Sequence, residues 1–400
     1  MKFDVIIVGG GLQGGLIALA FRHFQPHLRI LLIEKQKVVG GNHTWSFHAE
    51  DIPTQAIPIV EPLICTRWNG YHVQFPGFSR RVESPYYCIL SAQFHQVVSK
   101  ALSNSGHVLM LGTGVKSLQE ESVLTEDNMI YQSNLVLDAR GSASLSKNKG
   151  GFQKFVGWEI EPDTEWPENE PLLMDATVPQ QDGFRFIYTL PFSKRRILIE
   201  DTVFSDTPSW NKEEFRNNIR AWLSRHNRSS YRILREESGI LPMPWAGELP
   251  QVVQSSPIKV GSAGNWYHPA TGYSFPLAIR VALALAQGPL AESARRVSKL
   301  ASQISSRYRF SQFLNFLLFQ WIAPEDRWQV FRRLYRALPA HRLARFYALN
   351  FNLFDSIRMI VGQPPPISIR QMLKRYLNPN NLNRTTQRQI PCHPPSNPVA

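Results

Sequence analysis

Short apolar runs alternate with a glycine-rich turn over the first 34 residues. An apolar run at residues 4–8 leads into Gly9–Gly14, which fits the pattern G-x-G-x-x-G. An apolar stretch with helical spacing follows, and a second apolar run at residues 29–33 ends on Glu34. This pattern predicts a strand, a tight turn, a helix and a second strand that is closed by an acidic residue.

This layout is the one that a dinucleotide-binding βαβ unit needs. Gly9, Gly11 and Gly14 would let the backbone approach a pyrophosphate at the helix N-terminus, whose N–H groups and dipole attract anions. Glu34 lies twenty residues beyond Gly14, where a carboxylate can accept hydrogen bonds from the adenosine ribose. Plain helix–strand packing by Gly11 and Gly14 is the alternative. We expect binding, because the strands, the helix and the acid occur together.

The next part of the chain predicts further α/β structure and then a β-rich region. Residues 91–103 predict a helix with Ser91 as its N-cap. Between residues 152 and 255 the strand pattern dominates. Residues 184–192 and 195–204 flank a two-residue turn and predict a hairpin, and residues 212–226 predict a helix lying across that sheet.

An α/β pattern resumes at residues 258–261, and residues 274–287 predict a strongly apolar helix. The predicted class is α/β (α+β overall), with a β-sheet lobe inserted into a Rossmann-like domain. Interruption of the fingerprint domain favours a flavoprotein that holds FAD over a simple nicotinamide dehydrogenase. The predicted regions are a discontinuous FAD-binding domain (1–150 and 256–290), a β-rich substrate lobe (151–255), a basic aromatic helical membrane-facing region (291–377) and a disordered tail (378–400).

Composition narrows the class further. The chain has 400 residues, of which 43% are hydrophobic and 19% charged, as expected for a globular protein. Its three cysteines form no C-x-x-C pair, so we expect a reducing cytosol, no disulfide framework and no metal site. No run of 18 apolar residues occurs, so no membrane-spanning helix is expected.

The net charge of +13 is concentrated near the C-terminal end. Residues 295–375 hold fifteen lysines and arginines against three acidic residues, and aromatic residues are interleaved with them. Such a surface fits anionic phospholipid or nucleic acid. The dense apolar run at residues 313–323 favours lipid, and a helical cap that buries its own aromatic residues is the alternative. We predict contact with a membrane surface and none with nucleic acid.

Two further glycine segments could contact a cofactor. Gly41 lies in a loop after the second strand. In residues 261–278 a turn at Gly264 follows a strand, and a second turn at Gly272 opens a long apolar helix. Free N–H groups at Gly272–Ser274 would face a docked anion, such as the negative side of a reduced flavin. His268 in this segment can be either a structural histidine or an acid–base group.

Candidate acids follow from strand alternation in residues 195–202. Glu200 shares one face with Leu198 and Thr202, whereas Asp201 points to the other face. A carboxyl group in an apolar strand has a raised pKa, and when protonated it can donate a proton. Pairing of both carboxylates with nearby arginines is the alternative. Asp175, Arg185 and the pair Glu236-Glu237 lie in similar stretches, where structural pairing is the simpler reading.

Together these segments resemble the bacterial lycopene β-cyclases, and the resemblance covers most of the chain. The glutamate motif and the His-Pro-x-Thr-Gly-Tyr-Ser loop are its most specific parts. Flavin-monooxygenase relatives commonly have Gly-Asp-Ala where this chain has Gly261-Ser262-Ala263, which disfavours hydroxylase chemistry. The matching segments are the fingerprint and residues 40–47, 174–177, 198–202, 268–274 and 313–319.

The resemblance implies that reduced FAD assists a reaction without net redox change, with NAD(P)H as the source of electrons. Each ψ-end of lycopene, or of a related carotenoid, would close into a β-ionone ring, giving γ-carotene and then β-carotene. The family's acidic residue maps onto Glu200, as the catalytic residue, and the reduced flavin is the alternative as the immediate proton donor. The predicted cofactor-binding residues are Gly9, Gly11, Gly14, Glu34, Gly41, Gly264, Thr271, Gly272, Tyr273 and Ser274. The predicted substrate or secondary residues are Asp201, His268, Asp175 and Arg185.

The expected location is the cytoplasm, with peripheral attachment to the inner face of the cell membrane. Two other functions stay open. One is a flavin-dependent isoprenoid or lipid oxidoreductase, either a reductase or a monooxygenase, and the other is a non-catalytic prenyl-lipid carrier. The sequence leaves the choice between NADH and NADPH, and the oligomeric state, undecided.

Overall fold

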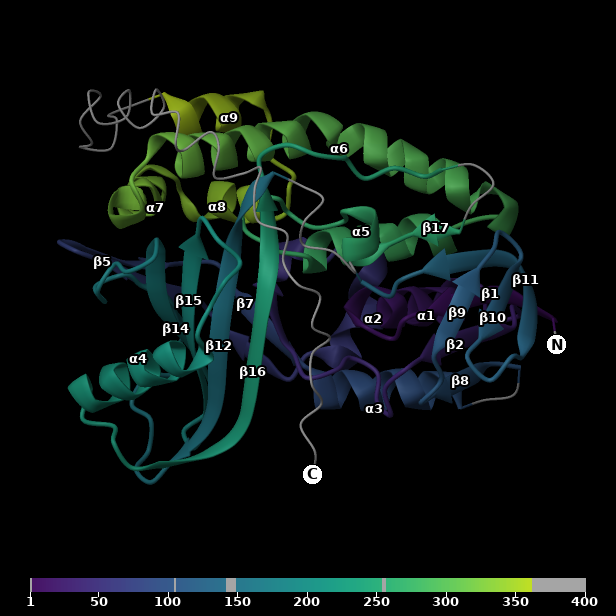
Figure 1. Cartoon of the computed structure of the whole chain (residues 1–400), viewed down its shortest axis with the longest axis horizontal. Helices are drawn as coiled ribbons and strands as arrows, with labels where there is room; N and C mark the ends of the chain where they lie inside the picture. The colour runs from purple at the N-terminus through teal and green to yellow at the C-terminus, as the bar shows by residue number, and fades with distance from the viewer. Residues whose placement is uncertain (1, 104–105, 142–148, 254–256, 362–400) are drawn as a thin grey trace.

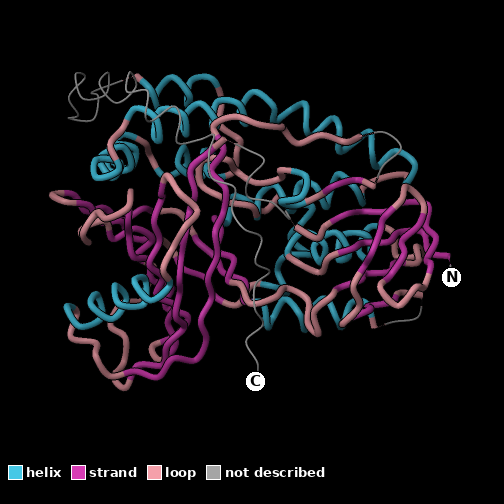
Figure 2. The backbone as a smooth tube through the Cα atoms, in the orientation of Figure 1, coloured by secondary structure: helices cyan, strands magenta, loops and turns pink. Residues whose placement is uncertain are grey.

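Two large β-sheets stand beside each other, and a layer of helices runs across one end of both (Figure 1). The computed structural model of the protein describes residues 2–103, 106–141, 149–253 and 257–361. The backbone trace separates a mixed α/β part from a part whose strands are longer (Figure 2). The two parts meet along the loops that follow the first sheet's strands.

The first sheet carries the N-terminal βαβ unit. Strands β1, β2, β8, β11 and β17 run parallel, whereas β9 and β10 are antiparallel. The inner strands read as almost continuous apolar runs because helices and strands cover both faces. The order is β8-β2-β1-β11-β10-β9, with β17 beside β11. The bounds are β1 Lys2–Val8, β2 Ile30–Glu34, β8 Val108–Leu111, β9 Val115–Leu118, β10 Ser122–Thr125, β11 Ile130–Asp138 and β17 Ile258–Lys259.

The second sheet has seven strands in the order β16-β12-β15-β14-β13-β5-β6. All neighbours in it are antiparallel except β13 and β5, which run parallel. One face packs into the main core of the molecule, and the other forms a separate core with helix α4. The bounds are β5 Tyr71–Phe75, β6 Phe78–Val82, β12 Gly150–Pro162, β13 Leu172–Asp175, β14 Phe184–Ser193, β15 Arg196–Ser205 and β16 Tyr231–Pro244. A third, small sheet has the order β3-β7-β4, with β3 Thr44–His48, β4 Thr66–Trp68 and β7 Tyr86–Leu90.

The helices take their places from their apolar faces. Helix α5 is apolar on nearly all sides and is buried between α1 and α6. Helix α4 buries only one stripe, which includes Phe215, Ile219 and Trp222, on the outer face of the second sheet. The bounds are α1 Leu12–Phe24, α2 Ile57–Val60, α3 Ser91–Leu102, α4 Lys212–Arg225, α5 Phe275–Ala286, α6 Ser293–Phe316, α7 Arg327–Ala337, α8 Ala340–Tyr347 and α9 Leu353–Ile360.

The structure confirms the predicted α/β class and the Rossmann-like βαβ unit, and it corrects details. The hairpin of β14 and β15 and the helix α4 across it occur where the pattern placed them. The N-cap of α3 is Leu90, not Ser91, because β7 passes straight into the helix and Ser91 is already helical. Strands β5 and β6, for which the pattern suggested no assignment, belong to the second sheet.

The C-terminal helices bury much of the apolar run that suggested lipid contact. Leu318, Phe319 and Ile322 lie in the protein interior, while Phe313 is 44% exposed. Within the described ranges, no helix is both long and apolar enough to cross a membrane. The predicted disordered tail, and the predicted helical residues after position 361, lie outside the described residues.

Candidate functional site

The fingerprint glycines play different roles in the first turn. Gly9 has φ +106°, and a Cβ on it would lie 2.5 Å from the carbonyl oxygen of Ala139, just after the neighbouring strand β11. A Cβ on Gly14 would collide with the carbonyl of Gly9. Gly9 and Gly14 are therefore required by the packing of the turn itself.

Gly11 differs, because no described atom beyond its chain neighbours lies within 4 Å of a Cβ built there. It is the N-cap of α1, and among the described residues no side chain caps this helix and its first turn has no acidic residue. The helix therefore opens onto free space with uncapped N–H groups. That arrangement fits the phosphates of a dinucleotide.

Glu34 is held at the end of β2, beside this turn. Its Oε2 accepts a hydrogen bond from the Gly10 N–H over 2.6 Å, and its Oε1 accepts one from the Gln36 N–H over 2.8 Å. These bonds orient the carboxylate next to the helix entrance. The side chain is in the place where a ribose would lie beside the phosphates.

The loop around Gly41 joins the two large sheets. Gly41 has φ +59°, which favours glycine at this bend. Just beyond it, the Asn42 side chain donates to the Glu236 carbonyl in β16 over 2.8 Å. Thr44 donates to a carboxylate oxygen of Glu237 over 3.1 Å. The hydrogen bonds of Asn42 and Thr44 thus attach the edge strand of the second sheet, β16, to the α/β part of the molecule.

The segment before α5 is tied together by internal hydrogen bonds. The Gly272 N–H donates to the His268 carbonyl, and the Tyr273 N–H donates to Thr271 Oγ1. The prediction of free N–H groups is therefore wrong for Gly272 and Tyr273, because the loop satisfies them itself. Helix α5 begins at Phe275 after Ser274, which makes no side-chain cap. The Tyr273 hydroxyl donates to Asp51 over 2.7 Å.

Glycines in this segment are required by close packing. A Cβ on Gly264 would collide with the Lys259 carbonyl, and one on Gly272, at φ +68°, would lie 2.9 Å from a methyl carbon of Leu241 in β16. The segment thereby presses against the second sheet. Asn315 of α6 donates to the carbonyls of Pro244 and Pro269, which ties the helix layer to the same place.

His268 is buried and neutral. Burial lowers its pKa to about 3. Its Nδ1 accepts a hydrogen bond from the Ala270 N–H over 3.1 Å, so this nitrogen carries no proton. Phe346 packs edge-on against its ring. These contacts suit a histidine that shapes the loop, and they disfavour its use as an acid near neutral pH.

Glu200 lies on the inner face of the second sheet, on β15. It is 3% exposed and is bonded by two hydroxyl groups: Thr202 Oγ1 to Oε1 at 2.6 Å and the Tyr188 hydroxyl to Oε2 at 3.2 Å. Burial, and then the nearby carboxylate of Glu237, hold the pKa of Glu200 well above its ordinary value. A protonated carboxyl at this place is equipped to donate a proton.

Asp201, Arg185 and Asp175 lie on the opposite face, under α4. Arg185 Nε lies 3.4 Å from a carboxylate oxygen of Asp201, which also accepts a bond from Asn218 of α4. Burial raises the pKa of Asp201 to about 6, against the opposing effect of Arg185. Asp175 accepts the Trp222 indole N–H over 2.7 Å. The sheet separates these three side chains from Glu200.

Sequence reasoning undervalued several residues on the inner face. The sequence pattern favours structural pairing for Glu237, yet this side chain is buried and points to the same side as Glu200. Tyr188 was not singled out, although it bonds Glu200 directly. The spacing Arg235-x-Glu237 was the feature of the sequence that placed an arginine and this glutamate on the same face of a strand. Buried or half-buried aromatic residues with polar groups gather farther along this face, namely His48, Tyr71, Tyr86, Tyr273, Tyr335 and Tyr347.

Comparison with known families then decides the group to which this architecture belongs. Residues 4–374 match the lycopene cyclase protein family. The chain belongs to that family. The matched range includes the fingerprint turn, Glu200 and the segment before α5.

Individual relatives agree with this assignment. The chain is 37% identical to the lycopene beta-cyclase of Pantoea ananas, over 91% of this chain and 95% of that one. It is 37% identical to the lycopene beta-cyclase of Pseudescherichia vulneris, over 90% and 94%. The lycopene beta-cyclase of Paracoccus sp. is 35% identical, over 91% and 95%.

Solved structures share the fold at much lower identity. A geranylgeranyl bacteriochlorophyll reductase-like protein from Thermoplasma acidophilum superposes with a TM-score of 0.63 at 15% identity, covering 96% of this chain and 98% of that one. The flavin-dependent brominase Bmp2 superposes with a TM-score of 0.58 at 15% identity, covering 87% and 94%. At these identities the likeness concerns the fold alone.

Proposed function

We propose that this protein is a lycopene β-cyclase, which closes the ψ-ends of lycopene into β-ionone rings to give γ-carotene and then β-carotene. Membership of the family and the full-length bacterial relatives support this activity. The observation that carries the mechanism is the buried, hydroxyl-bonded carboxyl group of Glu200, whose pKa is raised.

The reaction begins with a proton from Glu200. The proton adds to C2 of the terminal double bond and leaves a tertiary cation at C1. The neighbouring C5=C6 double bond then attacks C1, which forms the C1–C6 bond and moves the positive charge to C5. Loss of the C6 proton restores a double bond and closes the ring. One proton enters and one leaves, so the reaction has no net redox change and the acid can be restored.

The chain's own residues prepare this step. Burial keeps water away from Glu200, which preserves its protonated form and protects a cation from hydration. Thr202 and Tyr188 fix the orientation of the carboxyl group. Tyr86 and Tyr71 pack against each other farther along the same side of the molecule, and aromatic faces of this kind can stabilise positive charge.

FAD fits the first turn. Gly11 and the uncapped start of α1 would receive its phosphates, and Glu34 its ribose. Gly41 and the Gly264–Ser274 segment would line the part that faces the second sheet. Reduced FAD would supply an electron-rich surface beside the developing positive charge. NAD(P)H would keep it reduced without being consumed in proportion to product.

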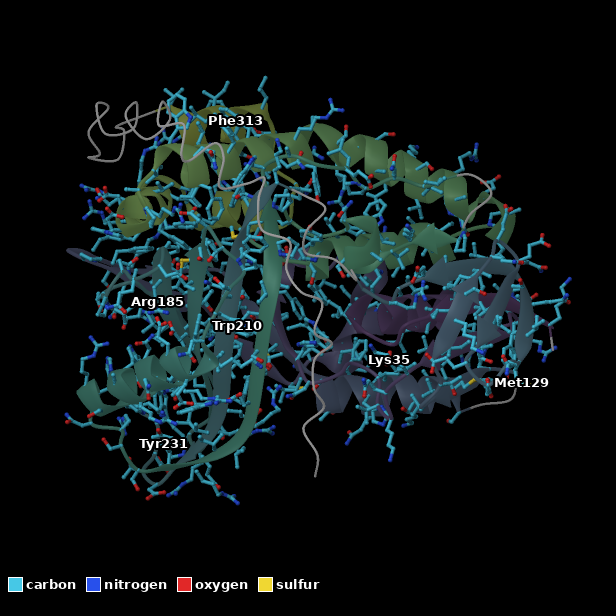
Figure 3. The ribbon with its side chains drawn as sticks, viewed as in Figure 1. Lys35, Met129, Arg185, Trp210, Tyr231 and Phe313 are labelled. Carbon is cyan, nitrogen blue, oxygen red and sulfur yellow. The ribbon has the colours of Figure 1, made fainter. Side chains whose placement is uncertain are left out.

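Lycopene resides in bilayers, so the enzyme must reach a membrane surface, and α9 provides an exposed apolar face for this contact. Leu353, Phe354 and Ile357 are 76%, 60% and 48% exposed, and Ile360 and Val361 continue the patch. Phe313 of α6 lies near this end of the molecule, opposite Met129 (Figure 3). Arg342 packs over the Phe354 ring, which adds positive charge beside the apolar side chains. Peripheral attachment at the inner face of the cell membrane is the location we propose.

An anaerobic assay tests the proposed reaction. Purified protein is incubated with lycopene in liposomes and chemically reduced FAD, without nicotinamide. The expected product is β-carotene, with γ-carotene as the intermediate. A hydrogenated product would instead identify a flavin-dependent reductase, and a hydroxylated product in a parallel incubation with O2 would identify a monooxygenase. Unchanged lycopene in both incubations would identify a carrier.

A further inference from the structure

Glu237 is a second buried carboxyl group on the inner face of the second sheet, across one strand from Glu200. In the sheet register, Gly157 of β12 stands opposite Glu200 on one side and opposite Glu237 on the other. Residues opposite one another in antiparallel strands point to the same face. Glu200 and Glu237 therefore flank Gly157 on one surface.

Gly157 leaves the space between the two acids open. A Cβ built on it would lie 3.3 Å from Glu200 Oε2 and 3.3 Å from Glu237 Cγ. A glycine inside a strand costs stability, so its presence commonly marks a close approach of other groups. Here the approaching groups are the two acidic side chains.

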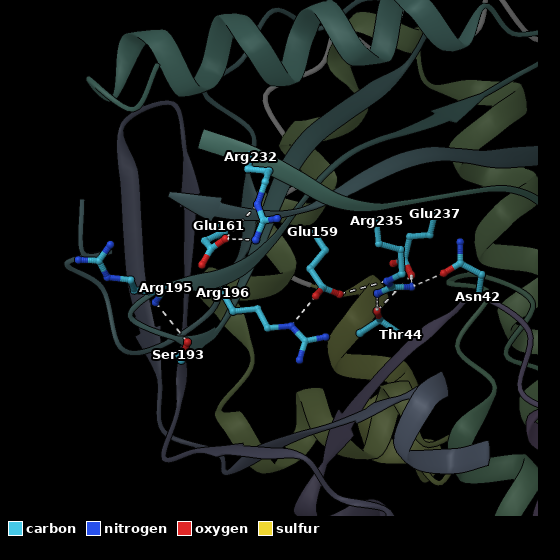
Figure 4. A network of polar contacts seen from close by, with 10 residues as sticks. All are labelled: Asn42, Thr44, Glu159, Glu161, Ser193, Arg195, Arg196, Arg232, Arg235 and Glu237. Carbon is cyan, nitrogen blue, oxygen red and sulfur yellow. Dashed lines mark hydrogen bonds and ion pairs between the residues drawn. The ribbon is translucent and has the colours of Figure 1, made fainter. Parts of the chain in front are cut away.

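The two carboxyl groups have different partners. Glu237 Oε2 accepts bonds from Arg235 Nη1 over 2.8 Å and from Thr44 Oγ1 over 3.1 Å (Figure 4). Arg235 is itself held by Thr44 and by Asn42, at 2.7 and 2.9 Å. Glu200 is bonded by hydroxyl groups, and within the described part of the chain it makes no ion pair.

Charge on this face balances only if Glu200 is neutral. Glu159 is bonded by both Arg196 and Arg235, so two guanidinium groups face two carboxylates, those of Glu159 and Glu237. An ionised Glu200 would be a third, uncompensated negative charge in a dry environment. The titratable and charged groups that face Glu200 or its neighbours include Tyr188 of β14, Arg196 of β15, Glu159 of β12, Arg235 and Glu237 of β16, Tyr86 and Cys88 of β7, and His43, which precedes β3 and interacts with Arg235.

Two neighbouring buried carboxyl groups titrate as a coupled pair, and their surroundings decide which one stays protonated. Burial raises the pKa of Glu237, and the Arg235 guanidinium and the Thr44 hydroxyl oppose that rise because they favour the charged form. No such cation acts on Glu200, whose pKa both burial and Glu237 raise. The proton of the pair therefore belongs on Glu200.

We propose that Glu237 is a positioning residue for the cyclisation: its carboxylate, held by Arg235 and Thr44, keeps the acid proton on Glu200. Asn42 and Thr44, the first residue of β3, directly follow Gly41, which is a predicted cofactor-binding residue. The protonation of Glu200 is therefore linked to the placement of this segment. The inference rests on the proposed role of Glu200 as the acid.

The test is the pH profile of Glu237→Gln in the full-length, FAD-loaded protein. Initial rates of β-carotene formation are measured from about pH 6 to about pH 9.5, with chemically reduced FAD and lycopene liposomes. Losing the negative neighbour frees Arg235 to stabilise ionised Glu200. The alkaline fall in rate should therefore move down by at least about one pH unit, and the ratio of rates at low and high pH should rise at least about tenfold.

Matched variants separate this electrostatic role from a structural one. Glu236→Gln alters the neighbouring residue, whose carboxylate pairs with Arg216 on the other face, and should leave the profile in place. Glu237→Asp should restore the alkaline limb at least in part. Thr44→Val, which removes one donor, should give a smaller shift in the direction of Glu237→Gln, and it serves if that variant fails to fold.

Equal loss of rate at every pH, or an unmoved alkaline limb in folded, FAD-loaded Glu237→Gln, would overturn the inference. That result leaves the acid role of Glu200 intact, provided that Glu200→Gln still abolishes turnover. Full activity of folded Glu200→Gln would instead refute the proposed mechanism itself. The two failures are thus distinguishable in one set of proteins.

Discussion

Glu200 and Asp201 are adjacent in strand β15, yet their side chains lie on opposite sides of the sheet. Glu200 faces the main core and bonds Tyr188 and Thr202, whereas Asp201 contacts Arg185 and Asn218 beneath α4. A single position along the strand therefore separates a carboxyl group suited to proton donation from one suited to holding a helix.

This separation predicts different outcomes for two conservative substitutions. Glu200→Gln should keep the fold and bound FAD but lower the rate of β-carotene formation by at least about 10²-fold, because the amide cannot donate an acidic proton. Asp201→Asn should retain most of the rate and lose stability instead, since it weakens the contact with Arg185. Product chromatography and thermal unfolding check both. A wild-type rate in folded Glu200→Gln would remove it from the scheme.

The wild-type pH profile follows from the raised pKa of Glu200. Its protonated form is the active one, so cyclisation should persist through neutral pH and be lost as the pH rises through the raised pKa. An unshifted glutamate would instead lose its proton below about pH 5. Initial rates with reduced FAD, measured across the alkaline range, test this expectation. A rate that already declines between about pH 5 and pH 6 as the pH rises would contradict it.

A substitution at Gly11, the N-cap of helix α1, should separate cofactor binding from folding. Gly11→Ala places a methyl group in open space at an ordinary backbone conformation, so unfolding of the FAD-free protein should be almost unchanged. The methyl group would occupy the approach to the helix N-terminus, and FAD affinity should fall at least about tenfold, equal to about 1.4 kcal/mol. Flavin fluorescence titration measures it.

Gly14→Ala is the contrasting variant for this turn. Its Cβ would collide with the Gly9 carbonyl, so the FAD-free protein itself should unfold at a lower temperature. If Gly11→Ala bound FAD as tightly as the wild type, the phosphates would have to lie elsewhere.

The lowered pKa of buried His268 predicts that the folded protein loses stability in acid. Its pKa is about 3 in the folded protein against about 6.5 when unfolded, so the folded state resists protonation. The contribution of neutral His268 to the free energy of unfolding is fully present above the unfolded pKa. It is lost as the pH falls from about 6.5 toward 3, by up to about 1.4 kcal/mol per pH unit. His268→Asn can still accept the Ala270 N–H and should flatten the dependence. Unfolding midpoints near pH 7.5 and pH 5 measure it, with exposed His27→Asn as control.

The apolar face of α9 predicts the site of membrane attachment. Replacing Leu353, Phe354 and Ile357 with serine should reduce sedimentation with anionic liposomes at least about tenfold, because each side chain would otherwise be buried in lipid. The fold should persist, since these side chains are exposed. Serine at Met129 and at the adjacent Ile130, which are both exposed, provides the control, because Met129 lies at the other end of the molecule (Figure 3). Equal binding by both variants would place the contact elsewhere.

The local sequence pattern predicted much of the fold, because helices, turns and hairpins depend on residues that are close in sequence. The strand–glycine–helix order of the first 34 residues and the hairpin at Ser193 are of this kind. The alternation that separates Glu200 from Asp201 is also local. The pairing of Glu200 with Glu237 is not, since it arises from a register in which β12 and β16 meet across about eighty residues. Likewise, no periodicity in the sequence predicts that β5 lies beside β13.

The parallel pairing of β5 and β13 determines which fragments of the chain can contain the complete second sheet. Leu172 pairs with His72 and Asp175 with Gln74, so the long sheet is completed by a strand encoded within the first hundred codons. A fragment spanning residues 151–255 would expose the unpaired edge of β13, to which strands of other copies can add. Chimaeras that exchange this sheet between relatives should therefore carry residues 71–82 along with it.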